Sequence, residues 1–372
     1  MFRLTQAVRS AGAALILTLA TTAAALPTAA AADDRDRDGR GGHVYVQTNN
    51  AAGNAVVAFE RDQDGRLTHE QTVATGGLGT SAGLGDQGAL AITDDKRHVL
   101  VVNAGSDSVS LFRINRDGLR LVDVQAVGDR PVSVDAHDDL VYVLSQGADT
   151  IEGLEIKDRG DLRSIPQSTR PLSTANANAA QVAFSPDGRV LAVTEKDTQT
   201  IDTYLVRSNG RADGPNAQPS SGATPFGFQF GPDGRLYVSE APGSAASSYN
   251  VDSAGRISVI SASVPNHQAA ACWLVVTSDG RFAYTANAGT ANVSHYTIDA
   301  NGALTLVGDG ANGATDPGPV DLDVTDGDGF LYVLNSRSGS ISGFSVDKGD
   351  GSLTKLDGVS GLATGWAGLV AV

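Results

Sequence analysis

The chain is poor in cysteine, in aromatic residues and in positive charge. Its 372 residues include a single cysteine, Cys272, so neither an intrachain disulfide nor a cysteine-based zinc cluster can form. The 42 aspartates and glutamates outnumber the 27 lysines and arginines, which gives a formal net charge of −15. Such a chain repels nucleic-acid phosphates and anionic membrane surfaces, so we expect neither as a partner.

Helical periodicity is also missing. Beyond the N-terminal segment, no stretch repeats apolar residues at i, i+3, i+4 and i+7, which argues against a helical-repeat fold. Glycine is abundant instead, with 44 residues, and no Gly-X-Y period accompanies it. Collagen is therefore excluded, and many tight turns in an all-β chain are indicated. A hydrophobic content of 41% is enough for a sizeable core.

The N-terminus has the composition of an export signal. Arg3 and Arg9 flank the start of an apolar stretch over residues 11–26, and the alanines at 29–32 offer small residues for cleavage. No twin-arginine pattern is present. Residues 1–32 therefore predict a general secretory signal and an extracellular or periplasmic protein, and residues 33–42 predict a charged, glycine-rich linker.

Internal repetition is the strongest signal in the sequence. Asp-Gly pairs recur before short apolar runs, and both residues of such a pair tolerate the positive φ of a tight hairpin. Seven runs occupy the same place in the repeat: 44–48, 99–103, 141–145, 191–195, 236–240, 283–287 and 331–335. Four-stranded units at this period are typical of β-propeller blades. We therefore predict that residues 43–372 form a single seven-bladed propeller.

The first repeat lacks its innermost strand. No strand precedes His43, whereas the last eight residues, 365–372, resemble an innermost strand such as 319–324. We expect the C-terminal run to complete the first blade, because an unpaired sheet edge would otherwise be exposed.

A polar residue ends the second strand of every repeat. These residues are Thr48, Asn103, Ser145, Glu195, Glu240, Asn287 and Asn335, and we expect them to approach the channel mouth opposite the Asp-Gly hairpins. The short side chains also fit as caps of the turns that follow. Glutamate is a poor local cap, so Glu195 and Glu240 are the candidate catalytic carboxylates. If burial raises the pKa of these carboxyl groups, one of them suits a general base. Alternatively, the carboxylates bind a divalent cation, which would take amide oxygens as further ligands. Both alternatives stay open.

Residues near the starts of the innermost strands complete the predicted site. His267, in the loop before the sixth repeat, is a candidate proton shuttle. The candidate substrate-binding residues are Asn103, Arg130, Gln181, Phe226, Trp273, Asn287 and Asn335. Trp273 also fits an inter-blade core, and Cys272 fits a small buried hydrophobic position.

Several segments resemble the lactonase-type seven-bladed propellers. They are Phe184-Ser185-Pro186-Asp187-Gly188-Arg189, Tyr284-Thr285-Ala286-Asn287, Tyr332-Val333-Leu334-Asn335 and Gly351-Ser352-Leu353-Thr354. That family includes bacterial 6-phosphogluconolactonases and fungal carboxymuconate-lactonising enzymes, and surface-layer propellers with Tyr-Val-Thr-Asn repeats look alike. The resemblance implies a metal-independent hydrolase or cyclase that acts on a lactone at the channel mouth. The chain departs from it at 176–181, where Asn-Ala-Asn-Ala-Ala-Gln replaces the His-Pro-His-like residues of the family.

Two functions remain open at this point. The first is a secreted lactone hydrolase or muconate-type cyclase, without a cofactor, in which Glu195 or Glu240 is the base; a variant places a divalent cation between the glutamates. The second is a non-catalytic extracellular propeller that binds a small ligand or a protein, and the missing histidines favour it. We expect a monomer with no membrane span.

Overall fold

The computed structural model describes residues 41–157 and 160–372, so the predicted signal and nearly all of the predicted linker lie outside the described residues. The described residues form one unit. The described chain contains strands in seven antiparallel sheets. Six of them have four strands in sequence-consecutive order, the seventh combines the first three strands with the last one, and three sheets carry a short extra strand. None of the described residues forms a helix long and apolar enough to cross a membrane.

Each sheet is one blade, and the innermost strand is named first. Blade 1 holds β31 (Ala367–Ala371), β1 (Gly42–Gln47), β2 (Ala55–Arg61) and β3 (Leu67–Ala74). Blade 2 holds β4 (Leu90–Ile92), β5 (His98–Asn103), β6 (Ser108–Asn115) and β7 (Gly118–Ala126). Blade 3 holds β8 (Pro131–His137), β9 (Leu140–Ser145), β10 (Thr150–Ile156), β11 (Leu162–Ser164) and β12 (Arg170–Pro171). Blade 4 holds β13 (Ala179–Phe184), β14 (Val190–Glu195), β15 (Thr200–Val206) and β16 (Ala212–Pro219).

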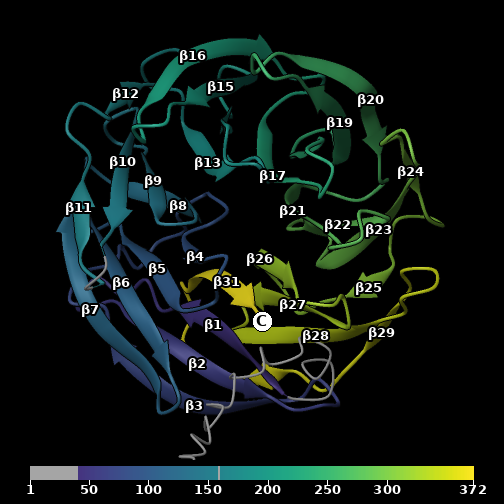
Figure 1. Ribbon diagram of the computed structural model, residues 1–372. Coiled ribbons are helices and arrows are strands. Elements are labelled where there is room, and N and C mark those ends of the chain that lie inside the picture. The colour runs from purple at the N-terminus through teal and green to yellow at the C-terminus, as the bar shows by residue number, and fades with distance from the viewer. Residues whose placement is uncertain (1–40, 158–159) are drawn as a thin grey trace, which may run out of the picture. The chain divides into compact units, whose positions relative to one another are not determined.

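The remaining blades repeat the pattern. Blade 5 holds β17 (Pro225–Phe230), β18 (Leu236–Glu240), β19 (Ala245–Val251) and β20 (Ile257–Pro265). Blade 6 holds β21 (Ala271–Val276), β22 (Phe282–Asn287), β23 (Asn292–Ile298), β24 (Leu304–Leu306) and β25 (Gly313–Ala314). Blade 7 holds β26 (Pro319–Val324), β27 (Phe330–Asn335), β28 (Ser340–Val346), β29 (Leu353–Lys355) and β30 (Val359–Ser360). Figure 1 shows the first strands of the blades around the centre and strands such as β3, β16 and β20 at the rim.

The seven predicted blades and the predicted closure are confirmed. The seven apolar runs of the repeat correspond to the second strands β1, β5, β9, β14, β18, β22 and β27. The C-terminal strand β31 pairs antiparallel with β1, with Val44 opposite Ala371 and Val46 opposite Leu369. The amide of His43 donates to the carbonyl oxygen of Val372 at 2.9 Å, and the reverse bond is 2.8 Å long. The two ends of the chain thus close one sheet and remove its open edge.

Neighbouring blades are joined by polar side chains of the innermost strands. Asp135 Oδ2 accepts the amide of Phe184 at 2.8 Å, one blade further along the ring. In the same way Gln229 Oε1 accepts the amide of Val276 at 2.7 Å, and Asp323 Oδ2 accepts the amide of Ala371 at 2.9 Å. Because a buried amide without a partner is costly, these bonds set the register of one blade against the next.

Buried tyrosines join the outer parts of the blades. Tyr142 donates its hydroxyl to the carbonyl oxygen of Gly210 at 2.9 Å, and Tyr284 and Tyr332 donate to those of Gly351 and Gly65 at 2.7 Å. Each bond crosses from one blade to the following one. The large rings therefore fill the space between sheets while each hydroxyl keeps a partner.

Candidate functional site

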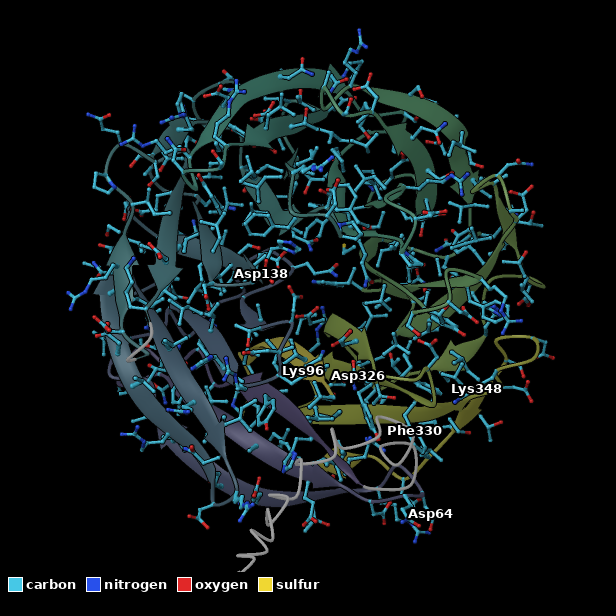
Figure 2. The ribbon with its side chains drawn as sticks, in the orientation of Figure 1. Asp64, Lys96, Asp138, Asp326, Phe330 and Lys348 are labelled. Carbon is cyan, nitrogen blue, oxygen red and sulfur yellow. The ribbon has the colours of Figure 1, made fainter. Side chains whose placement is uncertain are left out.

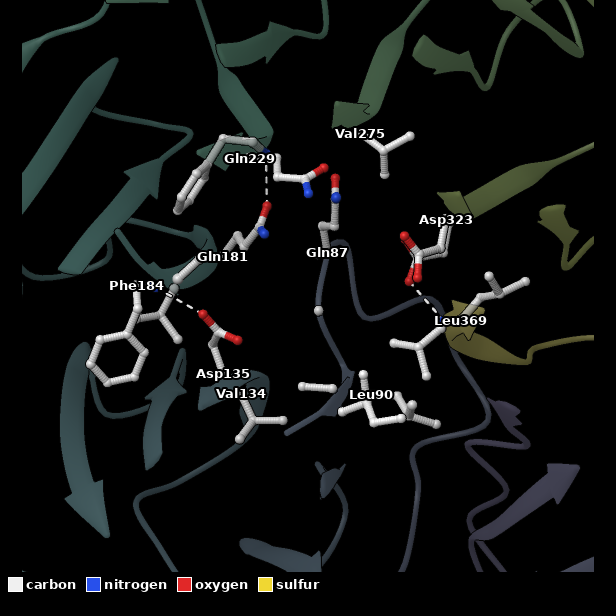
Figure 3. Close-up of a pocket in the computed structure, with 18 of the residues that line it drawn as sticks. Gln87, Leu90, Val134, Asp135, Gln181, Phe184, Gln229, Val275, Asp323 and Leu369 are labelled. Atoms are coloured by element: carbon white, nitrogen blue, oxygen red, sulfur yellow. Dashed lines mark hydrogen bonds between the residues drawn. The ribbon is translucent and has the colours of Figure 1, made fainter. Parts of the chain in front are cut away.

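A cavity of about 310 Å³ occupies the channel, and residues from all seven innermost strands line it. Figure 3 shows amide and carboxyl side chains pointing into this cavity, among them Gln181 and Gln229 on one wall and Asp323 on another. Burial raises the pKa of Asp135 and of Asp323 to about 7. The carboxyl groups of the channel thus accept hydrogen bonds from backbone amides, and they hold their protons more readily than exposed carboxyl groups do.

One end of the channel is crossed by residues 75–89, which connect β3 to β4 and which we call the crossing segment. The amide of Gln87 donates to the carbonyl oxygen of Ala180 in blade 4 at 3.2 Å. Its side-chain amide makes two bonds to the backbone of Leu274 in blade 6, donating to the carbonyl at 2.8 Å and accepting from the amide at 3.0 Å. Gln87 therefore links blade 4 to blade 6 across the position of blade 5 (Figure 3).

Asp86 is held at this end beside the starts of the innermost strands. Trp273 donates its indole N–H to the carbonyl oxygen of Asp86 at 2.7 Å, and Lys196 Nζ donates to the carbonyl oxygen of Gly85. The Asp86 side chain is 6% exposed, and its Oδ2 atom has no hydrogen-bond partner among the described residues. Burial raises the pKa of Asp86 to about 7, against the opposing effect of the charges on Lys196 and Arg130.

Lys196 supplies a buried positive charge next to Asp86. It follows the last residue of β14 and is 7% exposed. Its ammonium lies 5.0 Å from the centre of the Phe226 ring, and that ring packs edge-on against Trp273 with centroids 5.4 Å apart. Burial lowers the pKa of Lys196, and the Asp86 carboxylate opposes this shift.

The structure brings some of the predicted site residues together. Phe226, Trp273 and exposed Arg130 surround Asp86 and Lys196, from blades 5, 6 and 3. Neither Asp86 nor Lys196 is among the residues predicted from the sequence. Lys196 could have been found, because it directly follows Glu195 at a strand end already singled out, but the loop that carries Asp86 has no repeat counterpart.

The two predicted glutamates lie elsewhere, inside blades 4 and 5. Glu195 is fully buried and accepts hydrogen bonds from the Ser173 amide, the Ser173 hydroxyl and the Thr198 hydroxyl at 3.0, 2.7 and 2.6 Å. Glu240, 1% exposed, accepts the hydroxyls of Ser247 at 2.5 Å and of Ser263. Neither these two carboxyl groups nor Asp86 lines the channel cavity. The catalytic role of the two glutamates stays a prediction.

The predicted asparagines are also buried within their blades. Asn103 and Asn287 donate to the hydroxyls of Ser110 and Ser294, both at 2.8 Å. Asn335 is in hydrogen-bond contact with the Ser342 hydroxyl at 3.0 Å. These bonds join the side chains of the second strand to those of the third strand of the same blade. Capping of the turn and a role in substrate binding both stay predictions.

The last two predicted residues have different surroundings. Gln181 lines the channel cavity, and its Oε1 accepts the amide of Phe228 at 2.7 Å. His267 is exposed in the loop between β20 and β21, where its φ is +61°. In the part of the chain that the structure describes, no group of three or more His, Cys, Asp or Glu side chains is placed to hold a metal ion. The cation variant, which needs Glu195 and Glu240 from the neighbouring blades 4 and 5, stays a prediction.

The model of a known family matches residues 38–171 and 253–363, and it describes a lactonase with a seven-bladed β-propeller. The chain belongs to this lactonase family. The resemblance noted in the sequence is therefore confirmed. No curated protein matches the chain.

Solved structures of similar fold come from several bacteria. A candidate 6-phosphogluconolactonase from Bacteroides uniformis is 17% identical with a TM-score of 0.75, and the match covers 89% of this chain and 99% of that one. A periplasmic gluconolactonase from Pseudomonas aeruginosa is 18% identical with a TM-score of 0.70, covering 89% and 98%. A protein from Lactobacillus plantarum is 19% identical with a TM-score of 0.73, covering 88% and 98%. At these identities the likeness concerns the fold.

Proposed function

We propose that the protein hydrolyses a lactone at the channel end that carries the crossing segment, with Asp86 as the general base. One observation carries the proposal: Asp86 has a buried carboxyl oxygen without a partner among the described residues, while the buried ammonium of Lys196 lies beside the same segment. Membership of the lactonase family supports ester chemistry.

The proposed reaction needs two groups, and this end of the channel supplies both. Ionised Asp86 takes a proton from a water molecule as the water oxygen attacks the lactone carbonyl carbon. The carbonyl oxygen gains the negative charge, which Lys196 stabilises with donors beyond the one it gives to Gly85, because an ammonium has three. The bond between the carbonyl carbon and the ring oxygen then breaks, and the ring oxygen takes the proton from Asp86. The product is a hydroxy acid.

Substrate recognition in this proposal rests on the predicted residues that surround Asp86. The rings of Phe226 and Trp273 offer an apolar wall, and exposed Arg130 offers a positive charge for a substrate that bears an anion. With the predicted secretory signal, the substrate would be met outside the cytoplasm. A lactone in that compartment fits the export prediction better than a phosphorylated intermediate does.

A pH-stat assay tests this function on the purified mature protein. Sugar and acyl lactones are offered with and without chelator, and Asp86→Asn is compared with Glu195→Gln and Glu240→Gln. We expect acid release that chelator leaves unchanged and that Asp86→Asn alone abolishes. If a glutamate variant loses activity while Asp86→Asn keeps it, the general base is that glutamate and not Asp86. Loss with chelator would support the cation variant.

No release from well-folded protein on any lactone would favour the second hypothesis, the non-catalytic binding propeller. Binding of the same lactones, measured by calorimetry on the inactive protein, then separates a ligand-binding role from a protein-binding one.

A further inference from the structure

A buried polar contact recurs where the second strand of a blade meets the third, and blade 4 departs from the pattern. In blades 2 and 6 an asparagine contacts a serine seven residues later, Asn103 with Ser110 and Asn287 with Ser294. In blade 5 Glu240 contacts Ser247 at the same spacing. Blade 4 has two acids at these positions, Glu195 and Asp202, and both side chains are fully buried.

The two carboxyl groups share one donor. The backbone amide of Ser173 donates to Glu195 Oε1 at 3.0 Å and to Asp202 Oδ2 at 2.8 Å, so both oxygens lie around a single N–H group. The Ser173 and Thr198 hydroxyls donate to the other oxygen of Glu195. Asp202 Oδ1 is buried and has no partner among the described residues. Hydrogen-bond donors are therefore too few for two ionised carboxylates.

No cation from the described residues compensates the pair. Tyr204, on β15, has its hydroxyl 3.5 Å from Asp202 Oδ2 and donates to the carbonyl of Pro171 at 2.9 Å. Arg170, on β12, donates to the carbonyls of Gln167 and Thr169. Lys196 interacts with Asp86 instead. Strands β13 and β17 contain no charged residue. The neighbouring acids have other partners: Asp149 accepts the amides of Asn176 and Ala177, and Asp197 accepts the side-chain amide of Asn178.

We propose that Glu195 and Asp202 share one proton, and that loss of this proton at alkaline pH loosens residues 172–178, which the two carboxyls hold at Ser173 and which Asp149 holds at Asn176 and Ala177. Two buried like charges in contact repel each other and are poorly solvated, so one of them keeps a proton. Burial, followed by the effects of Glu195, raises the pKa of Asp202 to about 8. The inference goes beyond the proposed function and does not depend on it.

Hydrogen exchange on the intact protein tests the loosening. After correction for the intrinsic exchange rate, we expect the protection factors of residues 172–178 to fall by about tenfold or more between about pH 7 and about pH 9. In Asp202→Asn the amide group donates to Glu195 without a titrating proton, so protection stays constant over this range. Equal losses of protection in wild type and Asp202→Asn would overturn the proposal.

A second measurement follows the proton itself. The carboxyl carbon of Asp202, followed by NMR, should titrate with a step near pH 8 in wild type, and this step should disappear in Glu195→Gln. Titration of the Asp202 carboxyl below about pH 5 would refute the shared proton. The matched control is Glu240→Gln: Glu240 contacts serines and no second acid, so this variant should leave the step and the protection of 172–178 unchanged.

Discussion

The two ends of the channel are built differently although the same seven innermost strands run between them. At the end where these strands begin, the crossing segment carries Asp86 between blades, and the charges of Asp86 and Lys196 are buried. At the end where the strands terminate, Lys96 pairs with Asp326 at 3.2 Å across two blades, and both side chains are partly exposed (Figure 2).

The burial of the charged groups indicates which end of the channel can support catalysis. Charges in water interact weakly, so the Lys96–Asp326 pair contributes little to stability. Buried charges shift each other's pKa and can act on a bound molecule. The following predictions separate the two ends.

Asp86→Asn should cause the largest loss, on the order of 10³-fold in kcat/KM for lactone hydrolysis, because no base remains. In wild type the activity should increase with pH and level off above about pH 7, since Asp86 must be ionised to accept a proton. Initial rates from about pH 5 to about pH 9 check both statements. A pH profile that is flat across this range would argue against Asp86.

Lys196→Met should lower kcat by on the order of 10²-fold, because the developing oxyanion loses its positive partner. The charge of Lys196 lowers the pKa of Asp86, so its removal should shift the remaining pH profile towards alkaline values. Steady-state kinetics over the same pH range measures both effects. An increase in KM with kcat unchanged would assign Lys196 to substrate binding instead.

Gln87→Ala should lower the free energy of unfolding by about 1–3 kcal/mol, because both backbone groups of Leu274 lose their partners. Activity should fall about tenfold, since the crossing segment no longer fixes Asp86. The matched control is Gln229→Ala, which removes a bond of the same kind to Val276 away from the crossing segment. It should lose stability and keep activity; chemical denaturation and kinetics on both variants decide this.

Lys96→Ala should have the smallest effect, within about 1 kcal/mol in stability and without change in kcat/KM, because its pair with Asp326 is partly solvated. Denaturation at low and high salt is the measurement. A loss of activity comparable with that of Lys196→Met would place substrate at the other end of the channel.

The candidate site was only partly predictable from the sequence. Phe226, Trp273 and Arg130 were found because they stand near the starts of innermost strands, a position that the repeat itself marks. Glu195 and Glu240 were singled out because glutamate is a poor cap, yet serines and backbone amides several residues away satisfy them within the blade. Asp86 was missed because its environment depends on Leu274, Trp273 and Lys196, which are distant in the chain.

The sequence by itself determined the number of blades, their strand order and the closure by the C-terminal run. These follow from turn residues and apolar alternation, which act over a few residues and recur with each repeat. Only the tertiary structure decided that the segment between β3 and β4 crosses the channel. It also decided that the carboxyl groups of Glu195 and Asp202 share the backbone amide of Ser173 as a hydrogen-bond donor. Both depend on contacts between separate segments, and burial changes the behaviour of a carboxyl group only when those contacts exclude water.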